Sequence, residues 1–197
     1  MGPDQLAAEA PLKVRAFYGL PLPETQRQEL GRYLETCAKV APEFRWSVVD
    51  NLHITVRFMG NVDRVVAEGI ASRLEQNPGP TFELVLGNVG QFKQSRLARV
   101  VWLSMTGGVE ELVALASRVE AGCREAGLEP EKRAFQPHLT LARARARDGA
   151  ALPELPPLPM VRPWTADELV LYWSHLGKGG AVHEPIHRIR LGATSAR

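Results

Sequence analysis

Two stretches of the chain, NLHITVRFMG at residues 51–60 and QPHLTLARAR at residues 136–145, contain the same short arrangement of side chains. Each places a histidine, any residue, a threonine and an apolar residue in a run of apolar and β-branched residues, which predicts a β-strand. The chain has only five histidines, and His53 and His138 occupy this frame. An imidazole beside a hydroxyl, repeated once, can bind and protonate an anion.

Side chains on a strand alternate between its two faces, so the frame predicts which groups lie together. The histidine and the threonine of each frame share one face, about 6–7 Å apart along the strand. The apolar residues share the other face and should pack beneath helices. The polar faces are expected to contain His53, Thr55 and Arg57 in the first stretch and His138 and Thr140 in the second; the apolar faces are expected to contain Ile54, Val56 and Phe58 in the first and Leu139 and Leu141 in the second.

Two such polar faces that converge on one cleft would form a binding site for a small anion such as a phosphate group. Two hydroxyls would donate hydrogen bonds to its oxygens, and two imidazoles would stand on opposite sides of it. Histidine has an ordinary pKa of about 6.5, so one imidazole can remove a proton from water while the other protonates the leaving oxygen. Each such group contributes about 10²–10⁴-fold to a rate. Imidazolium, hydroxyl and backbone donors can meet the developing charge without a divalent metal.

The two frames also lie at the same distance from an upstream aromatic residue. Thirty-six residues separate Phe17 from His53, and thirty-six separate Trp102 from His138. Each interval has the pattern of a strand, a helix and then the strand that carries the frame. We therefore expect a duplicated architecture with pseudo-two-fold symmetry, in which the two motif strands face each other across one groove.

Hydrophobic periodicity predicts the other elements. Helical spacing of apolar residues predicts helices at residues 24–41, 62–76 and 109–127, and Gly127 lies where a C-terminal cap glycine is expected. The proline-rich residues 147–163 are expected to form an ordered surface loop. Strands are expected at residues 12–23, 44–50, 51–60, 81–92, 98–105, 134–144, 166–176 and 181–191.

Composition is that of a soluble globular protein, with 45% hydrophobic and 23% charged residues. The net charge of +2 means that any basic surface for nucleic acid must be local. No apolar run approaches the ~20 residues of a membrane span, and the N-terminus lacks the apolar segment of a signal peptide. Residues 1–10 are expected to fray. Cys37 and Cys123 fall on apolar helical stripes, so we expect buried free thiols in a reducing cytoplasm.

The duplicated frame and its flanks resemble the 2H phosphoesterase superfamily, and in particular the RNA 2′,3′-cyclic phosphodiesterases, once described as 2′-5′ RNA ligases. The resemblance covers nearly the whole chain. It implies an α+β fold in which residues 11–197 form a single catalytic domain of two pseudo-symmetric lobes, each with an antiparallel sheet and flanking helices, around a central cleft. The stretches that carry it are RAFYGLPLP, RWSVVDNLHITVRFMGNV, ARVVWLSM, EKRAFQPHLTLARAR and DELVLYWSHLGKGGAVHEPI.

The resemblance implies a metal-independent hydrolase, without a cofactor, that opens a 2′,3′-cyclic phosphate at an RNA 3′ end and leaves a 2′-phosphomonoester. His53 corresponds to the proton donor to the leaving 3′ oxygen, and His138 to the proton acceptor that activates water. Thr55 and Thr140 correspond to the phosphate-binding hydroxyls. Its partners would be RNA 3′ ends or nucleoside 2′,3′-cyclic phosphates, and we expect a cytoplasmic monomer with no membrane association and no obligate protein partner. The sequence departs from the family at His183, where an aromatic residue, often tyrosine, is expected.

Arg143 ends the second frame and is a candidate substrate-binding residue. Strict alternation places it with Leu139 and Leu141, away from His138, whereas a bulge or a strand end would redirect it. An ordinary surface or structural arginine is the other interpretation. Two basic strips are either RNA-backbone contacts or solvated charged faces. They consist of Arg145 and Arg147, and of Lys93, Arg96 and Arg99.

Other functions fit the same frame. A 2H esterase that acts on 2′-5′ oligonucleotide linkages or on small cyclic phosphates would share it, and so would a module that binds RNA ends without turnover. A zinc site is disfavoured, because His183 and His187 on one extended strand would lie about 13 Å apart. Four aromatic residues could include one that stacks on an RNA base, although most of them are expected to belong to the core. These are Phe17, Trp46, Trp102 and Tyr172.

Overall fold

The computed structural model describes residues 12–177 and 180–192, so the prediction for residues 1–10 lies outside the described residues. Within those ranges the chain forms nine strands, three α-helices and one 3-10 helix, η1. In chain order they are β1 (Lys13–Pro21), α1 (Glu24–Val40), β2 (Phe44–Trp46), η1 (Val49–Asn51), β3 (His53–Asp63), α2 (Arg64–Gln76), β4 (Phe82–Gln94), β5 (Leu97–Gly107), α3 (Val109–Glu125), β6 (His138–Ala144), β7 (Trp164–Ala166), β8 (Glu168–Gly177) and β9 (Gly180–Arg190).

Several predicted bounds were wrong. The strand predicted at residues 134–144 begins only at His138, and the helix predicted at residues 62–76 begins at Arg64 because β3 continues to Asp63. The strand predicted at residues 44–50 ends at Trp46, because the chain turns there into η1 and the Ser47 N–H donates to the carbonyl of Leu141 at 2.8 Å. The strand predicted at residues 166–176 is preceded by a separate strand, β7, which includes its first residue and pairs with β4. β8 instead pairs with β1 and β9.

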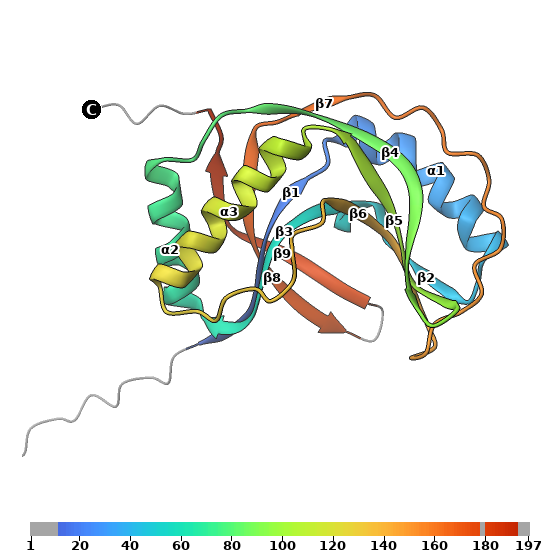
Figure 1. The fold of residues 1–197 in the computed structure, drawn as a ribbon, viewed down its shortest axis with the longest axis horizontal. Coiled ribbons are helices and arrows are strands. Elements are labelled where there is room, and N and C mark those ends of the chain that lie inside the picture. The colour runs from blue at the N-terminus through green and yellow to red at the C-terminus, as the bar shows by residue number, and fades with distance from the viewer. Residues whose placement is uncertain (1–11, 178–179, 193–197) are drawn as a thin grey trace, which may run out of the picture.

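All strand pairs are antiparallel, and the strands follow one another in the order β7-β4-β5-β6-β3-β1-β8-β9, with β2 paired to β6. One lobe consists of β3, β1, β8 and β9, and the other of β6, β5, β4, β7 and β2. The lobes join where β3 meets β6, through the single pair Ile54 and Leu139. Helices α2 and α3 lie side by side at one end of the molecule, and α1 lies at the other (Figure 1). This is the two-lobed α+β architecture expected from the sequence.

The two motif strands are direct neighbours. The sequence pattern predicted that they face each other across a groove, whereas β3 and β6 run antiparallel, side by side, at the junction of the lobes. Their lead-in elements match: β1 and α1 precede β3 as β5 and α3 precede β6. β1 pairs with β3 and β5 pairs with β6, so each motif strand lies between its own lead-in strand and the other motif strand.

A bulge interrupts β3 directly after its frame. Two consecutive residues of β1 pair with Thr55 and Arg57 of β3. Val56, between them, has no partner on β1 and is the extra residue of the bulge. Beyond the bulge the alternation is reversed. Arg57, predicted on the histidine face, has a side chain only 9% exposed, and its Nε donates to Glu120 of α3 at 2.5 Å. Phe58, predicted on the apolar face, is 38% exposed.

A bulge at the equivalent position interrupts β6. One step along β5 spans the two steps from Thr140 to Ala142, so Leu141 is the extra residue. Leu141 and Ala142 are consecutive and both fully buried, which breaks strict alternation. Arg143 is therefore exposed on the face that carries His138 and Thr140. The alternation argument placed it on the wrong face, and the bulge that was considered for it is present.

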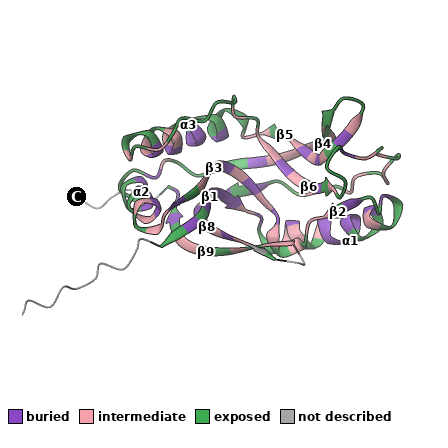
Figure 2. Ribbon diagram, turned by 90° about the horizontal axis from the view of Figure 1, so that it is seen from below, coloured by how far each residue is buried: buried purple, intermediate pink, exposed green. Residues whose placement is uncertain are grey.

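The core lies beneath the apolar faces of both motif strands. Ile54 and Leu139 are fully buried and Val56 is nearly so, as their position in the frame predicted. They belong to one large cluster with members from both lobes, and Figure 2 shows the buried segments gathered inside the layers. Cys37 and Cys123 are fully buried free thiols, as predicted.

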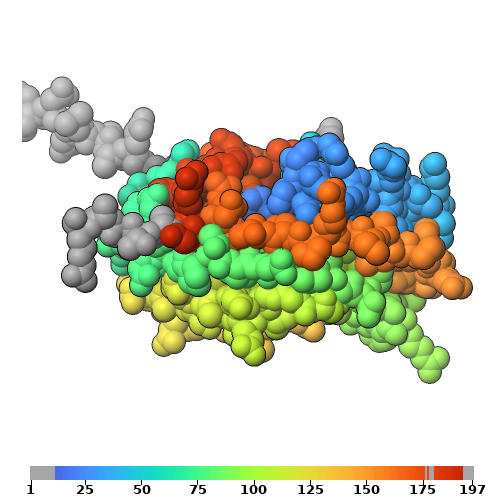
Figure 3. Space-filling model, turned by 90° about the horizontal axis from the view of Figure 1, so that it is seen from above, coloured from blue at the N-terminus to red at the C-terminus, as the bar shows by residue number. Residues whose placement is uncertain are grey.

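The proline-rich segment forms no regular secondary structure apart from a bridge at Ala150, and it packs on the surface as predicted. Between residues 151 and 163 it crosses one face of the molecule, between α1 and β4 (Figure 3). The side-chain amide of Gln26 on α1 donates to the Arg162 carbonyl at 3.1 Å. None of the helices in residues 12–177 and 180–192 is long and apolar enough to span a membrane.

Truncation at the junction of the lobes should destabilise the protein strongly. Leu139→Ala removes a fully buried side chain between the two polar residues of the second frame, and we expect it to lower the free energy of unfolding by about 2–5 kcal/mol. Urea denaturation followed by circular dichroism measures this change. Val113→Ala, at a position on α3 that is 42% exposed, is the control and should change it by less than about 0.5 kcal/mol. Equal stabilities of the two variants would contradict the packing described here.

Candidate active site

His53 begins β3, directly after η1, and two hydrogen bonds hold its ring. Its Nδ1 lies 2.7 Å from the backbone oxygen of Asn51. A carbonyl oxygen can only accept, so Nδ1 carries a hydrogen and donates it. Its Nε2 lies 3.1 Å from the Thr55 hydroxyl, which donates to it when the ring is neutral. Nε2 is therefore the nitrogen available for proton exchange.

His138 begins β6, and an equivalent bond at Nδ1 holds its ring. Its Nδ1 donates to the backbone oxygen of Gln136 at 2.7 Å. In both frames the acceptor is the carbonyl two residues before the histidine. The same local backbone geometry therefore selects the same tautomer twice and leaves Nε2 free of the backbone in both rings.

The antiparallel junction brings the two frames together. Because the strands are antiparallel, the residue before Ile54 lies opposite the residue after Leu139, and the residue after Ile54 lies opposite the residue before Leu139. His53 therefore lies beside Thr140, and Thr55 lies beside His138. Each imidazole has one hydroxyl two residues away on its own strand and another across the junction. All four predicted frame residues thus belong to one continuous polar surface.

Arg143 is close enough to act on both imidazoles. The bulge in β6 turns it to the face of His138, and its positive charge lowers the pKa of His138 and of His53. Although its side chain is exposed, neighbouring protein atoms partly desolvate the Arg143 guanidinium. This desolvation and the charge of Arg99 lower the pKa of Arg143, which nevertheless stays protonated. The second frame therefore contributes a permanent positive charge in addition to its imidazole and hydroxyl.

Both imidazoles are neutral near pH 7 in the free protein. Burial lowers the pKa of His53 to about 4; the hydrogen bond to Asn51 opposes this shift, and the charges of His183, Arg143 and His138 add to it. Burial is also the main cause that lowers the pKa of His138. In each case the neutral form is favoured because a buried charge loses its hydration.

Aromatic rings surround His53. The Phe17 ring lies 4.7 Å from the imidazole between centroids, and the Tyr172 ring lies 6.1 Å away. His183 of β9 meets the imidazole edge-on at 5.0 Å and meets Phe17 edge-on at 4.9 Å. Burial lowers the pKa of His183, and its buried Nδ1 has no hydrogen-bond partner among the residues that the structure describes. The residue at which the sequence departs from the family thus completes this aromatic wall.

A second aromatic group surrounds His138. Phe92 meets the imidazole edge-on at 5.0 Å, and Trp102 lies 6.1 Å from it. A Cβ at Gly90 of β4 would overlap the Trp102 ring, so the glycine lets the indole lie flat across β4. The equal spacings noted in the sequence therefore place one aromatic ring against each histidine.

Among the described residues, Asn51 links the first frame to the hairpin of β8 and β9, and no such bond is found for the second frame. The Asn51 side-chain amide donates to the carbonyl of Ala181 on β9 at 2.6 Å, while the Asn51 carbonyl accepts from His53. His183 lies two residues farther along β9. Within the described part of the chain, the Gln136 side chain makes no comparable bond. The two frames are therefore alike in sequence and unlike in surroundings.

Sequence reasoning missed two residues of this site, Phe92 and Asn51. Phe92 lies at the end of a strand in another part of the chain, and no local pattern connects it to His138. Asn51 carries a weak signal, because it lies two residues before the histidine whose ring it orients. His183 was noted only as a departure from the family.

The remaining histidines lie outside the site. His175 pairs with Glu184 at 2.9 Å, and His187 pairs with Glu75 at 3.2 Å. Among the residues that the structure describes, no group of three or more histidine, cysteine, aspartate and glutamate side chains could hold a metal ion.

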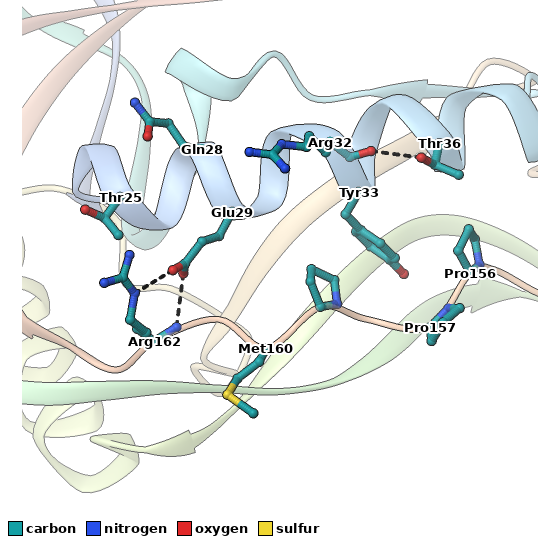
Figure 4. Close-up of a pocket in the computed structure, with 11 residues that line it drawn as sticks. Thr25, Gln28, Glu29, Arg32, Tyr33, Thr36, Pro156, Pro157, Met160 and Arg162 are labelled. Atoms are coloured by element: carbon teal, nitrogen blue, oxygen red, sulfur yellow. Dashed lines mark hydrogen bonds and ion pairs between the residues drawn. The ribbon is translucent and has the colours of Figure 1, made fainter.

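A separate groove of about 590 Å³ lies between α1 and the proline-rich segment (Figure 4). Glu29 and Arg162, which form an ion pair at 2.6 Å, line it together with Tyr33 and Met160. None of the four frame residues borders this groove. It is therefore distinct from the polar surface at the junction of the lobes.

A family model described as the 2′-5′ RNA ligase superfamily matches residues 31–178, about three quarters of the chain and both frames. The chain belongs to this superfamily. An RNA 2′,3′-cyclic phosphodiesterase of Escherichia coli is 30% identical over 178 residues, which cover 88% of the chain and 94% of that protein. A protein of the same name from Aeropyrum pernix is 36% identical over 127 residues, 64% of the chain and 72% of that protein.

Solved structures of the superfamily agree with the fold. A crystal structure of E. coli LigT complexed with 3′-AMP superposes with a TM-score of 0.77 at 29% identity, and covers 92% of the chain and 100% of LigT. A Thermus thermophilus protein, TT0787, gives a TM-score of 0.73 at 26% identity over 90% of the chain and 97% of that protein. This superfamily member therefore shares its architecture with LigT along nearly its whole length.

Titration should show that the His53 ring is neutral near pH 7 in the protein without ligand and that it gains a proton when an anion binds. We expect the His53 ring signals to titrate with a midpoint near pH 4. Saturating inorganic phosphate should raise this midpoint by one unit or more, because a neighbouring negative charge favours imidazolium. NMR measures both midpoints, and the His53→Ala variant assigns the signals. A midpoint of 6.5 or higher in the free protein would contradict the burial described for this ring.

Proposed function

We propose that the chain is an RNA 2′,3′-cyclic phosphodiesterase, a hydrolase that opens a cyclic phosphate at an RNA 3′ end and leaves a 2′-phosphomonoester. The observation that carries this proposal is the meeting of two equivalent frames on neighbouring strands, each with its imidazole Nδ1 bonded to the backbone. The Escherichia coli and Aeropyrum pernix relatives bear that name, and the chain aligns with almost all of the E. coli protein.

The two imidazoles have opposite roles in this reaction. Nε2 of His138 accepts a proton from water, and the water oxygen forms a new bond to phosphorus. The bond from phosphorus to the 3′ oxygen breaks, and Nε2 of His53 gives that oxygen its proton. The product carries a free 3′ hydroxyl and a 2′-phosphomonoester. Family resemblance decides which histidine donates, and the common tautomer makes both Nε2 atoms competent.

The substrate supplies the charge that the proton donor needs. In the free protein the pKa of His53 is about 4, so its ring is neutral near pH 7. A cyclic phosphate carries one negative charge, and a negative charge beside a buried imidazole favours the imidazolium form. Binding therefore loads the proton onto His53 that is later donated to the 3′ oxygen.

Three further side chains hold the phosphate in this proposal. The hydroxyls of Thr55 and Thr140 lie beside the two imidazoles and donate hydrogen bonds to its free oxygens. The guanidinium of Arg143 faces the same surface and neutralises charge that grows on phosphorus during attack. None of these steps requires a metal ion, so the reaction should proceed in the presence of a chelator.

Each histidine should be essential for turnover. His53→Ala and His138→Ala should each lower kcat on adenosine 2′,3′-cyclic phosphate by about 10²–10⁴-fold, with EDTA present throughout. His175→Ala is the control, because that ring is exposed and pairs with Glu184 outside the site. Chromatography of the products measures turnover and shows which hydroxyl keeps the phosphate. Tight binding of the cyclic phosphate without any product would instead favour an RNA-end-binding module, and a strong preference for a 2′-5′ linkage would favour the other esterase.

A change of leaving group should separate the donor from the acceptor. A substrate with sulfur in place of the 3′ oxygen needs no protonation as the bond breaks, since a thiolate is a far better leaving group. On this substrate His53→Ala should recover most of the lost rate, whereas His138→Ala should remain impaired by about 10²-fold or more. Single-turnover kinetics of both variants on both substrates make the comparison. Recovery by His138→Ala alone would exchange the two roles.

A further inference from the structure

Two arginines face each other at the outer end of the second motif strand. Arg45 of β2 lies directly opposite Arg143 of β6 in the antiparallel register. Both side chains are exposed. Like charges directly opposite each other on neighbouring strands destabilise a sheet. The pair therefore does not serve the stability of the free protein.

Neither of these guanidinium groups is compensated. Arg57, Arg64 and Arg162 each form an ion pair with a glutamate. Among the residues that the structure describes, Arg45 and Arg143 form no ion pair and donate no side-chain hydrogen bond. Arg99 of β5 adds a further positive charge near Arg143. Both positive charges are therefore available to an anion from outside the chain.

The two arginines share the face of the proposed catalytic groups. The bulge at Leu141 turns Arg143 to the side of His138, and residues directly opposite on neighbouring strands point to the same side. β3 and β2 lie along the same edge of β6, because β5 occupies the other edge at both places. Arg45 therefore stands on the same surface as His53, about 10 Å farther along that edge at ~3.3 Å per residue.

We infer that Arg45 binds the internal phosphodiester that precedes the terminal cyclic phosphate, so that the substrate is an RNA chain rather than a mononucleotide. This inference rests on the proposed function. An RNA strand presents a second phosphate one nucleotide from its end, and a guanidinium binds phosphate with paired, charge-assisted hydrogen bonds. The phosphodiester also relieves the repulsion between Arg45 and Arg143. A mononucleoside cyclic phosphate has no group to place there.

Comparison of a mononucleotide with a trinucleotide tests the inference. The two substrates are adenosine 2′,3′-cyclic phosphate and an RNA trinucleotide that ends in a 2′,3′-cyclic phosphate. Arg45→Gln should lower kcat/KM for the trinucleotide about threefold to tenfold and leave the mononucleotide unchanged. Arg45→Lys should retain most of the trinucleotide activity because it keeps the charge. Unchanged mononucleotide turnover also shows that the variant is folded.

Arg124→Gln is the matched control. It removes the same charge from the exposed end of α3, which lies at the opposite side of the molecule from β2 (Figure 1). Both substrates should be hydrolysed at the normal rate by this variant. On the trinucleotide, a plot of log kcat/KM against log salt concentration should be less steep by about 0.7 for Arg45→Gln than for the unmodified protein.

Two results would overturn the inference. One is an equal loss on both substrates, and the other is no loss on either. If the unmodified protein hydrolyses neither substrate, the proposed function fails by itself. Arg45 is then tested by equilibrium binding of a trinucleotide that ends in a 3′-phosphate. Weaker binding by Arg45→Gln than by Arg124→Gln would support the inference, and equal binding would overturn it.

Discussion

One extra residue in each motif strand determines which side chains reach the polar surface at the junction of the lobes. If the same residues formed regular strands without bulges at Val56 and Leu141, alternation would direct Arg57 toward the imidazoles and Arg143 into the core. The bulges reverse both outcomes. Arg57 reaches Glu120 on α3, where its charge is paired, and Arg143 reaches the polar surface. An unpaired guanidinium in the apolar core would be costly, so the bulge in β6 keeps Arg143 out of the core and places its positive charge at the site.

Repetition of the frame does not make the two histidines equivalent. Each ring donates Nδ1–H to the carbonyl two residues before it, which follows from local backbone geometry alone. Their wider surroundings differ, because among the described residues β9 contacts the first of them and not the second. Asn51 ties the backbone of His53 to β9, and the ring of His183 stands against it. Acid–base catalysis needs one histidine to donate a proton and the other to accept one. The difference between their surroundings comes from β9, which lies outside the duplicated unit.

The alternation of side chains along a strand correctly predicted the part of the site that lies within one frame. Alternation within four residues placed His53 beside Thr55 correctly, and the buried partners Ile54 and Leu139 followed from the same rule. Alternation failed at Arg143, because a bulge depends on the register with β5, which the sequence of β6 does not encode. Residues from distant strands were found only by folding the chain.

Phe92 and Arg45 illustrate that limit. Phe92 contacts His138 only because β4, β5 and β6 lie next to one another in the sheet. Arg45 belongs to a three-residue strand, too short to show a pattern, and its position depends on pairing with a strand almost one hundred residues later. The topology of the sheet, rather than the propensity of any segment, determines both positions.

At the junction of the lobes, each of the two duplicated units has an element that packs against or pairs with the other unit. β2 belongs to the first repeat and pairs only with β6 of the second, while α3 of the second packs against β3 of the first. A single repeat would thus expose both its short strand and the apolar side of its motif strand. Such a unit would also lack part of the buried cluster to which both lobes contribute. The two repeats therefore depend on each other for a complete core.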